Sequence, residues 1–301
     1  MRIGLSAGGA FERVVEQVKE AEAEGFAAMW FAGAVTFDPL IAIAVAGRAT
    51  ERIELGTSVV QTYPKHPIAM AQEAAAVQSA LGDAGAGRFT LGIGVSHEPA
   101  VQGMLKVPYD RPGRNLREYL DILVPLLRGE QVNVKGDFWS ATAAMANAPS
   151  PAPSVLVAAL GPVMLQAAGS RADGTILWMG NARAIETHVA PTIAAAANGG
   201  SPRIVAGLPV AVCDDEAEGR AEAAKQFAGY GMLPNYQRIL AHGGIESPGD
   251  AAIVGDEASV TKQLQGLLDA GATDVWAAIF PVGGDRRASR QRTRDLLRTL
   301  L

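Results

Sequence analysis

Cysteine is almost absent from this chain, because Cys213 is the only one among 301 residues. A single cysteine excludes an internal disulfide and any zinc or iron–sulfur site built from several thiolates. Since Cys213 ends an apolar segment, we expect it to be a small buried hydrophobic residue. Histidines are also few, and their spacing matches no metal-binding motif, so we expect no metal site. They are His66, His97, His188 and His242.

The chain also lacks long apolar runs and excess positive charge. No apolar run reaches the roughly 20 residues that span a membrane, and segment 1–20 turns charged after one short apolar stretch, unlike a signal peptide. The formal net charge is −5 and neither end carries a basic tail, which argues against non-specific nucleic-acid binding. We therefore expect a soluble cytoplasmic protein whose partner is a small-molecule substrate, with no nucleic acid and no membrane.

Short catalytic motifs are missing as well. The sequence has no GxGxxG turn opening a helix, no Walker A loop, no HExxH and no GxSxG elbow. What it does have is 49% hydrophobic residues, only 19% charged residues and 34 glycines. This composition is typical of a folded chain with a sizeable core, and it excludes a disordered or fibrous one.

Eight short apolar runs recur along the chain and predict strands. Their nearly continuous apolarity indicates parallel strands covered on both faces, rather than antiparallel strands with one solvent-exposed face. The runs cover 2–6, 27–32, 53–60, 88–95, 154–160, 174–179, 203–213 and 273–280.

Segments with helical periodicity separate these runs. In 12–25, for example, Val14, Val15 and Val18 form an apolar stripe and Gly25 is a candidate C-cap. Eight strand–helix units in about 300 residues predict an α/β fold, a (β/α)8 TIM barrel, as one domain over 1–301. A doubly wound parallel sheet is the structural alternative.

Two segments interrupt the repeating pattern. Residues 96–153 contain a helix near 112–128, a hairpin-like stretch and a Pro-rich stretch, which we interpret as an insertion after strand four. Residues 230–256 form a second, helical or irregular excursion. Long excursions in compact domains are often functional lids, although a plain surface excursion is the alternative.

Active sites of barrels lie at the carboxyl ends of the strands, so the residues after each run are the candidates. His97 follows the fourth run, where an imidazole could exchange a proton with a substrate. His66 is more simply explained as a cap of the next helix. Gly161 and Pro162 begin a helix directly after a strand, and its free N–H groups could bind a phosphate. We expect His188 and His242 at the surface.

Together these segments resemble the bacterial luciferase-like family, and within it the oxidoreductases that use the deazaflavin coenzyme F420. The resemblance spans nearly the whole chain. Its most specific part is ERIELGTSVVQTYPKHPIAMAQEAAAVQSAL followed by GRFTLGIGVSHEP; EAEGFAAMWFAG, YLDILVPLLRGEQVNVKGDFW and VAALGPVMLQAAGSRADGTI add to it.

The resemblance implies a dimeric barrel that binds a flavin-like ring in its mouth. It implies a bulge in strand three at Ser58-Val59, often with a non-prolyl cis peptide, which supports the ring from behind. It also implies a phosphate-binding turn after strand five and further coenzyme contacts after strand six. The cofactor-binding residues expected on this basis are Ala32, Ser58, Val59, Val95, Ser96, His97, Leu160, Gly161, Pro162, Val163 and Arg183.

The chain departs from the family pattern in two places. Relatives often carry a polar proton-handling group after strand two, where this chain reads Phe31-Ala32-Gly33. Sugar-phosphate-oxidising members place an acidic residue where His97 stands. We therefore expect an F420-dependent oxidoreductase that transfers a hydride to or from a small organic substrate, with His97 as the catalytic residue. The alternatives are an FMN-dependent monooxygenase and a non-catalytic coenzyme-binding barrel.

Overall fold

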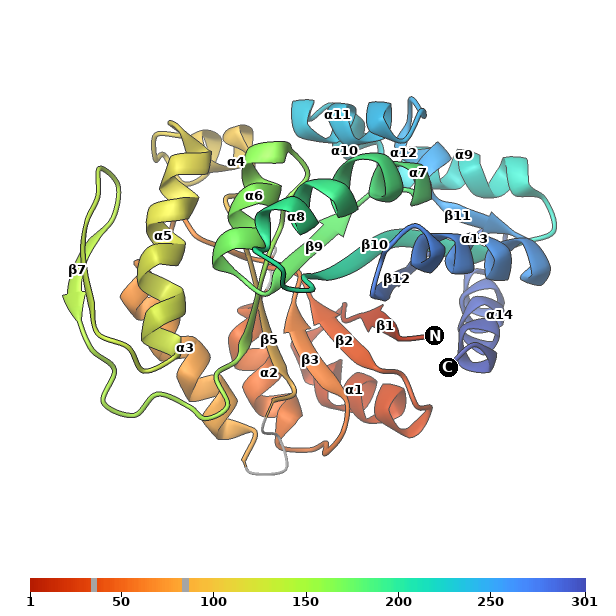
Figure 1. The fold of residues 1–301 in the computed structure, drawn as a ribbon. Coiled ribbons are helices and arrows are strands. Elements are labelled where there is room, and N and C mark those ends of the chain that lie inside the picture. The colour runs from red at the N-terminus through yellow and green to blue at the C-terminus, as the bar shows by residue number, and fades with distance from the viewer. Residues whose placement is uncertain (34–36, 83–86) are drawn as a thin grey trace.

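The computed structural model describes residues 1–33, 37–82 and 87–301. Eight parallel strands form a ring that closes between the last strand and the first, with helices on the outside (Figure 1). The predicted (β/α)8 barrel is thus confirmed, and the doubly wound alternative is wrong. The barrel strands are β1 (Ile3–Ser6), β2 (Ala28–Phe31), β3 (Glu54–Thr57), β5 (Phe89–Gly94), β8 (Ser154–Val157), β9 (Gly174–Trp178), β10 (Arg203–Val212) and β12 (Asp274–Ile279).

The helices that cover the barrel begin at residues suited to helix starts. The Asp38, Asp256 and Asp285 side chains each accept backbone N–H bonds at such a start. His66 does the same through Nδ1, which accepts from the Ile68 N–H at 3.2 Å and confirms its capping role. The covering helices are α1 (Val14–Ala23), α2 (Pro39–Gly47), α3 (Pro67–Ala80), α5 (Pro112–Leu127), α6 (Pro162–Arg171), α8 (Ala190–Ala196), α13 (Glu257–Asp269) and α14 (Arg286–Thr299).

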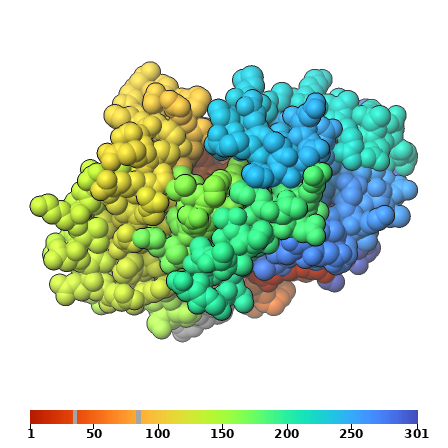
Figure 2. All heavy atoms as spheres, turned by 45° about the horizontal axis from the view of Figure 1, so that its top comes forward, coloured from red at the N-terminus to blue at the C-terminus, as the bar shows by residue number. Residues whose placement is uncertain are grey.

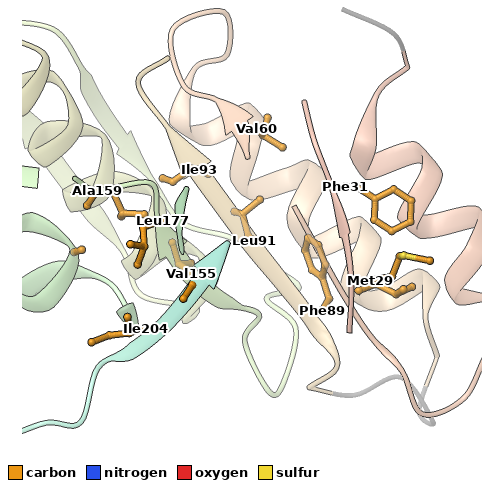
Figure 3. Close-up of a cluster of buried hydrophobic side chains, with 14 of the residues drawn as sticks. Met29, Phe31, Val60, Phe89, Leu91, Ile93, Val155, Ala159, Leu177 and Ile204 are labelled. Carbon is orange, nitrogen blue, oxygen red and sulfur yellow. The ribbon is translucent and has the colours of Figure 1, made fainter. Parts of the chain in front are cut away.

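Each strand buries both of its faces, which explains the continuous apolarity of the eight runs. Met29, Leu91 and Leu177 belong to the cluster between the barrel and the helices (Figure 3). Trp30 and Ile176, one residue away from Met29 and Leu177, belong to a second cluster inside the barrel. This alternation is the two-residue period of a strand.

Two tryptophans fill the barrel interior, and glycines make room for them. A Cβ on Gly56 would lie 2.3 Å from the Trp30 ring, and one on Gly207 would lie 2.2 Å from the Trp276 ring. Both tryptophans are buried. Many of the strand glycines are therefore packing partners of large rings.

An ion cluster lies below the tryptophans, at the amino ends of β3, β10 and β12. The Arg203 guanidinium binds Glu54 at 2.6 Å and Asp274 at 2.7 Å, and Arg2 pairs with both acids. Burial opposes ionisation of the Asp274 carboxyl, but hydrogen bonds from Arg203 hold its pKa below the ordinary value. This end of the barrel is thus closed by charges that are paired with one another.

The two interrupting segments are more regular than we expected. In 96–153, α5 packs between α3 and α6 as an ordinary barrel helix, so only the parts around it depart from the repeat. These parts contain α4 (Glu98–Gly103) and the antiparallel hairpin of β6 (Val132–Lys135) and β7 (Ser140–Ala143), which confirms the hairpin.

The segment 230–256 is mostly helical. It contains the three-residue strand β11, which pairs with β10 outside the ring and which we did not predict. The helices of this part of the chain are α9 (Glu216–Gln226), α10 (Ala228–Gly231), α11 (Pro234–His242) and α12 (Pro248–Ala251), and β11 covers Ile253–Gly255. Among the described residues, no helix is both long and apolar enough to cross a membrane.

Candidate functional site

The carboxyl ends of the barrel strands form a mouth. Figure 2 shows a hollow there, bordered by the yellow segment around α4, the green start of α6 and the blue α10–α11 segment. Residues of the red N-terminal part of the chain form its floor. The hollow lies where catalytic sites of (β/α)8 barrels are found.

A bulge interrupts the third strand at this end. Leu55 and Gly56 pair with Phe89 and Thr90, whereas Val60 and Gln61 (β4) pair with Ile93 and Gly94. Residues 57–59 of the third strand thus lie opposite residues 91–92 of β5, so the third strand has one extra residue. The Ser58-Val59 peptide within the bulge is cis, as the family resemblance implied. The expected strand 53–60 is therefore two strands, and the bulge displaces the backbone between them.

Glycines of β5 make room for the bulge. A Cβ on Gly92 would lie 1.9 Å from the Thr57 carbonyl oxygen, and one on Gly94 would lie 2.9 Å from Val59 Cγ2. Val59 packs against the cluster inside the barrel, below the mouth. The Ser58 hydroxyl is buried and has no hydrogen-bond partner among the described residues. The bulged Ser58-Val59 backbone is thus the part of the third strand that could support a planar ring from behind.

The end of β5 brings Val95, Ser96 and His97 to the mouth. Ser96 has φ of 61°, a left-handed conformation that is uncommon for residues other than glycine and that often marks functional sites. Tyr109 donates its hydroxyl hydrogen to the Ser96 carbonyl at 3.2 Å. Burial, together with the charge of Tyr63 and Glu98, raises the pKa of Tyr109 to about 12, so its phenol stays protonated.

His97 lies at the start of α4, and its ring does not cap that helix. The ring centroid is 5.5 Å from that of Tyr236 in α11. Burial lowers the pKa of the His97 imidazole, so the ring is neutral near pH 7. Its nitrogens have no hydrogen-bond partner among the described side chains and backbone, which leaves them free to accept or donate a proton.

An aromatic wall continues from His97 across the mouth, and we did not predict it. We define it as Tyr236, Tyr230 and Trp178, which follow one another with ring centroids 4.8 Å and 6.0 Å apart. Trp178 is the last residue of β9, and its ring centroid is 5.0 Å from that of Trp276. No motif or periodicity in segment 230–256 marks Tyr230 and Tyr236 as site residues. Only the return of α10 and α11 over the mouth brings them to His97.

The predicted phosphate turn, Leu160–Val163, lies at the start of α6. Gly161 is the N-cap and has no side chain that could cap the helix, and Pro162 is the first helical residue. The N–H groups of Val163 and Met164 have no acceptor among the described residues. Free N–H groups at a helix N-terminus, together with the helix dipole, suit a phosphate.

Two of the predicted cofactor-binding residues, Ala32 and Arg183, do not belong to the bulge, the end of β5 or the phosphate turn. Ala32 is exposed after β2, next to residues 34–36, which are part of the predicted rim and lie outside the described residues. Arg183 lines an outer hollow of about 490 Å³ with Arg220 and Lys262. None of the other predicted cofactor-binding residues borders that hollow.

The expected surface position of His188 is wrong. His188 is only 8% exposed, because its ring stacks on His242 and contacts the Leu160 carbonyl in the turn before α6. His242 is exposed, as expected. Cys213 is buried in a small apolar cluster, which confirms the expected structural role.

Comparisons with known proteins agree with this geometry. The sequence profile of the luciferase-like monooxygenases matches residues 2–299. An F420-dependent glucose-6-phosphate dehydrogenase of Amycolatopsis mediterranei is 34% identical over 149 residues, which cover 48% of this chain and 43% of the relative.

Two solved structures share the fold over nearly the whole chain. The coenzyme F420 dependent tetrahydromethanopterin reductase of Methanopyrus kandleri superposes with a TM-score of 0.78 at 21% identity, covering 97% of this chain and 96% of that one. The oxygenating constituent of 3,6-diketocamphane monooxygenase of Pseudomonas putida, in complex with FMN, has a TM-score of 0.74 at 18% identity, covering 99% and 97%. This chain belongs to the luciferase-like monooxygenase family.

Proposed function

We propose that the protein is an F420-dependent oxidoreductase that transfers a hydride between the deazaflavin and a small organic substrate. The observation that carries the proposal is the mouth itself, where the Ser58-Val59 bulge and the uncapped start of α6 offer a surface for a planar ring and two free N–H groups for a phosphate. The similarity to F420-dependent relatives supports this choice of cofactor.

When bound, the deazaflavin would supply a ring carbon that gives or accepts a hydride. The chain's own residues supply position and proton transfer. Val59 and Ser58 would support the ring from behind, and the Val163 and Met164 N–H groups would bind the phosphate. His97, neutral at pH 7, accepts the hydroxyl proton of an alcohol substrate or returns it in the reverse direction.

The walls of the mouth favour an uncharged substrate. The aromatic wall carries no charged side chain, and Met104 and Met232 expose 61% and 78% of their surface on the segments bordering the hollow. His97 stands where sugar-phosphate-oxidising members of the family place an acidic residue, which argues against the sugar-phosphate substrate of the Amycolatopsis relative. We therefore propose a small alcohol, ketone, enone or imine as the substrate.

The experiment is a fluorescence-quenching titration of the purified apoprotein with F420 and with FMN. We expect F420 to bind with the lower dissociation constant. Clearly tighter binding of FMN, with oxygen uptake when reduced FMN is added, would instead indicate a monooxygenase; the FMN-bound structural neighbour is the observation that favours this second candidate. Retained F420 binding without turnover of any alcohol, ketone, enone or imine would indicate a coenzyme-binding barrel.

We also propose that the protein is a cytoplasmic homodimer. Helix α2 is apolar on every side, and a helix of this kind is normally buried all round. Its outward residues Ile41 and Val45 are nevertheless 60% and 44% exposed. A second copy of the chain would cover this face.

A further inference from the structure

His188 makes a direct contact with the phosphate turn from outside the mouth. It lies in the π-helical segment Ile185–Val189, and its Nε2 is 2.8 Å from the Leu160 carbonyl oxygen. A carbonyl oxygen can only accept, so Nε2 carries the hydrogen and donates it. π-Helical turns are rare and occur frequently at functional sites.

A second histidine holds the His188 ring in place. The imidazole of His242, at the end of α11, lies parallel to it, with ring centroids 3.8 Å apart and 1° between the planes. Because His188 is almost fully buried and stacked in this way, its ring has little freedom to turn. The donor that contacts Leu160 is therefore fixed in direction.

The contact matters because it holds the Leu160–Gly161 peptide directly, whereas the other restraints act on either side of it: the Leu160 side chain packs on the core, and the Leu165 N–H binds the Gly161 carbonyl at 3.0 Å. The Leu160 carbonyl and the Gly161 N–H belong to the same planar peptide unit, so fixing one fixes the other. Apart from its own neighbours along the chain, no described atom lies within 4 Å of the position that a Cβ on Gly161 would take, so tertiary packing does not fix this residue. Gly161 in turn begins α6, whose free Val163 and Met164 N–H groups point out of the helix end.

We propose that His188 is a positioning residue: its hydrogen bond to Leu160 holds the turn in the conformation that presents the α6 N–H groups to the phosphate of the cofactor. The inference rests on the proposed function, and it concerns the phosphate-bearing part of the ligand alone. Preorganised donors bind more tightly because no ordering cost is incurred on binding. Loss of the hydrogen bond also leaves a buried carbonyl without its donor, so the turn rotates toward water.

The test compares a phosphate-bearing ligand with its phosphate-free counterpart. Dissociation constants for F420 and for the deazaflavin riboside that lacks the phosphate are measured by fluorescence quenching; FMN and riboflavin are run in parallel. For His188→Met we expect about tenfold weaker binding of F420, corresponding to the loss of one buried hydrogen bond. The affinity for the riboside should change less than about twofold.

His188→Gln is the matched variant, because its amide reaches a similar distance and can donate to Leu160. We expect it to bind F420 within about threefold of the wild type. Circular dichroism checks that each variant folds, and His188→Leu replaces His188→Met if the latter does not. A merely structural role would weaken F420 and riboside binding equally and would not distinguish Gln from Met.

The other outcomes of these titrations also test the positioning role of His188. Equal losses for both ligands, or no loss for F420, would overturn the positioning role. A wild-type protein that binds the riboside as tightly as F420 would show that no phosphate binds at this turn, and would overturn the inference while leaving the hydride-transfer proposal intact. A wild-type protein that binds none of the four ligands would overturn both.

Discussion

His97 is the imidazole that the fold brings to the mouth of the barrel, and its ring has no hydrogen-bond partner in the described chain. Its neighbours are aromatic: Tyr236 faces it, and Tyr230 and Trp178 follow. Burial among such rings disfavours the imidazolium and lowers the pKa of His97. A neutral imidazole at pH 7 is ready to accept a proton, which is what alcohol oxidation requires.

We expect His97→Ala to lower kcat by about 10²-fold or more, because the proton then has no acceptor at the mouth. The dissociation constant for F420 should stay within a few-fold. In the wild type, kcat/KM for alcohol oxidation should be constant above about pH 6.5 and fall as acid protonates the imidazole. Steady-state kinetics with bound F420 across pH 5–8 test both expectations.

His66→Ala is the control for loss of an imidazole elsewhere. It removes the cap of α3 and should lower the free energy of unfolding by about 0.5–2 kcal/mol while kcat is unchanged. Unchanged kcat in His97→Ala would remove this residue from the mechanism.

At the scale of elements, the bulge and β5 form one unit. The bulge brings Val59 and Ser58 to the mouth, and the glycines of β5 allow the bulged backbone to approach. The Thr57 hydroxyl donates to the Gly92 carbonyl at 2.7 Å and accepts from the Gly92 N–H at 2.8 Å, which replaces the interrupted strand pairing. The two glycines of the LGIG stretch, Gly92 and Gly94, are therefore explained by the neighbouring strand and by no ligand motif.

We expect Gly92→Ala to be strongly destabilising. Its Cβ would overlap the Thr57 carbonyl oxygen, and backbone cannot move aside as a flexible side chain can. Overpacking of this kind costs about 3 kcal/mol or more in free energy of unfolding, measured by chemical denaturation.

The matched substitution is Gly266→Ala in α13, where a Cβ meets no atom within 4 Å. There we expect a gain of about 0.5–1 kcal/mol, because alanine favours a helix over glycine. Equal unfolding free energies of the two variants would contradict the proposed role of Gly92.

At the scale of the whole molecule, the ion cluster joins strands from distant parts of the sequence. Glu54, Arg203 and Asp274 are the first residues of β3, β10 and β12, and Arg203 binds both acids. Arg203 also lies over the Trp30 ring, with its guanidinium carbon 5.6 Å from the ring centroid.

We expect Arg203→Met to lower the free energy of unfolding by about 3–5 kcal/mol, because it leaves two buried carboxylates with Arg2 as their one remaining cationic partner among the described residues. Arg292→Met removes a surface pair with Asp214 and Glu257 and should cost at most about 1 kcal/mol. Chemical denaturation compares the two, and similar losses would mean that the cluster contributes no more than a surface ion pair.

The proposed dimer is tested by the oligomeric state. Ile41→Glu together with Val45→Glu should convert the dimer to a monomer, because two charges cannot be buried in an apolar interface. Light scattering on a size-exclusion column measures the mass. Met232→Glu, an equally apolar and exposed position elsewhere, should leave the dimer intact. A wild-type protein that is monomeric would overturn the proposal.

The barrel could be predicted from the amino-acid sequence, because eight apolar runs and the helices between them have periods that local chemistry imposes. The caps at His66 and Gly161 could also be predicted, because they depend on residues next to one another.

Which strand ends and loops come together at the mouth could not be predicted, because it depends on contacts between residues far apart in the sequence. The contact of His97 with Tyr236 and that of His188 with Leu160 join residues 139 and 28 positions apart. Such contacts depend on how α10, α11 and the π-helical turn fold back over the barrel. Hydrophobic periodicity records which face of an element is buried, but not against which partner. That is why His188 was expected at the surface, although its ring is buried against the turn that we propose binds the phosphate.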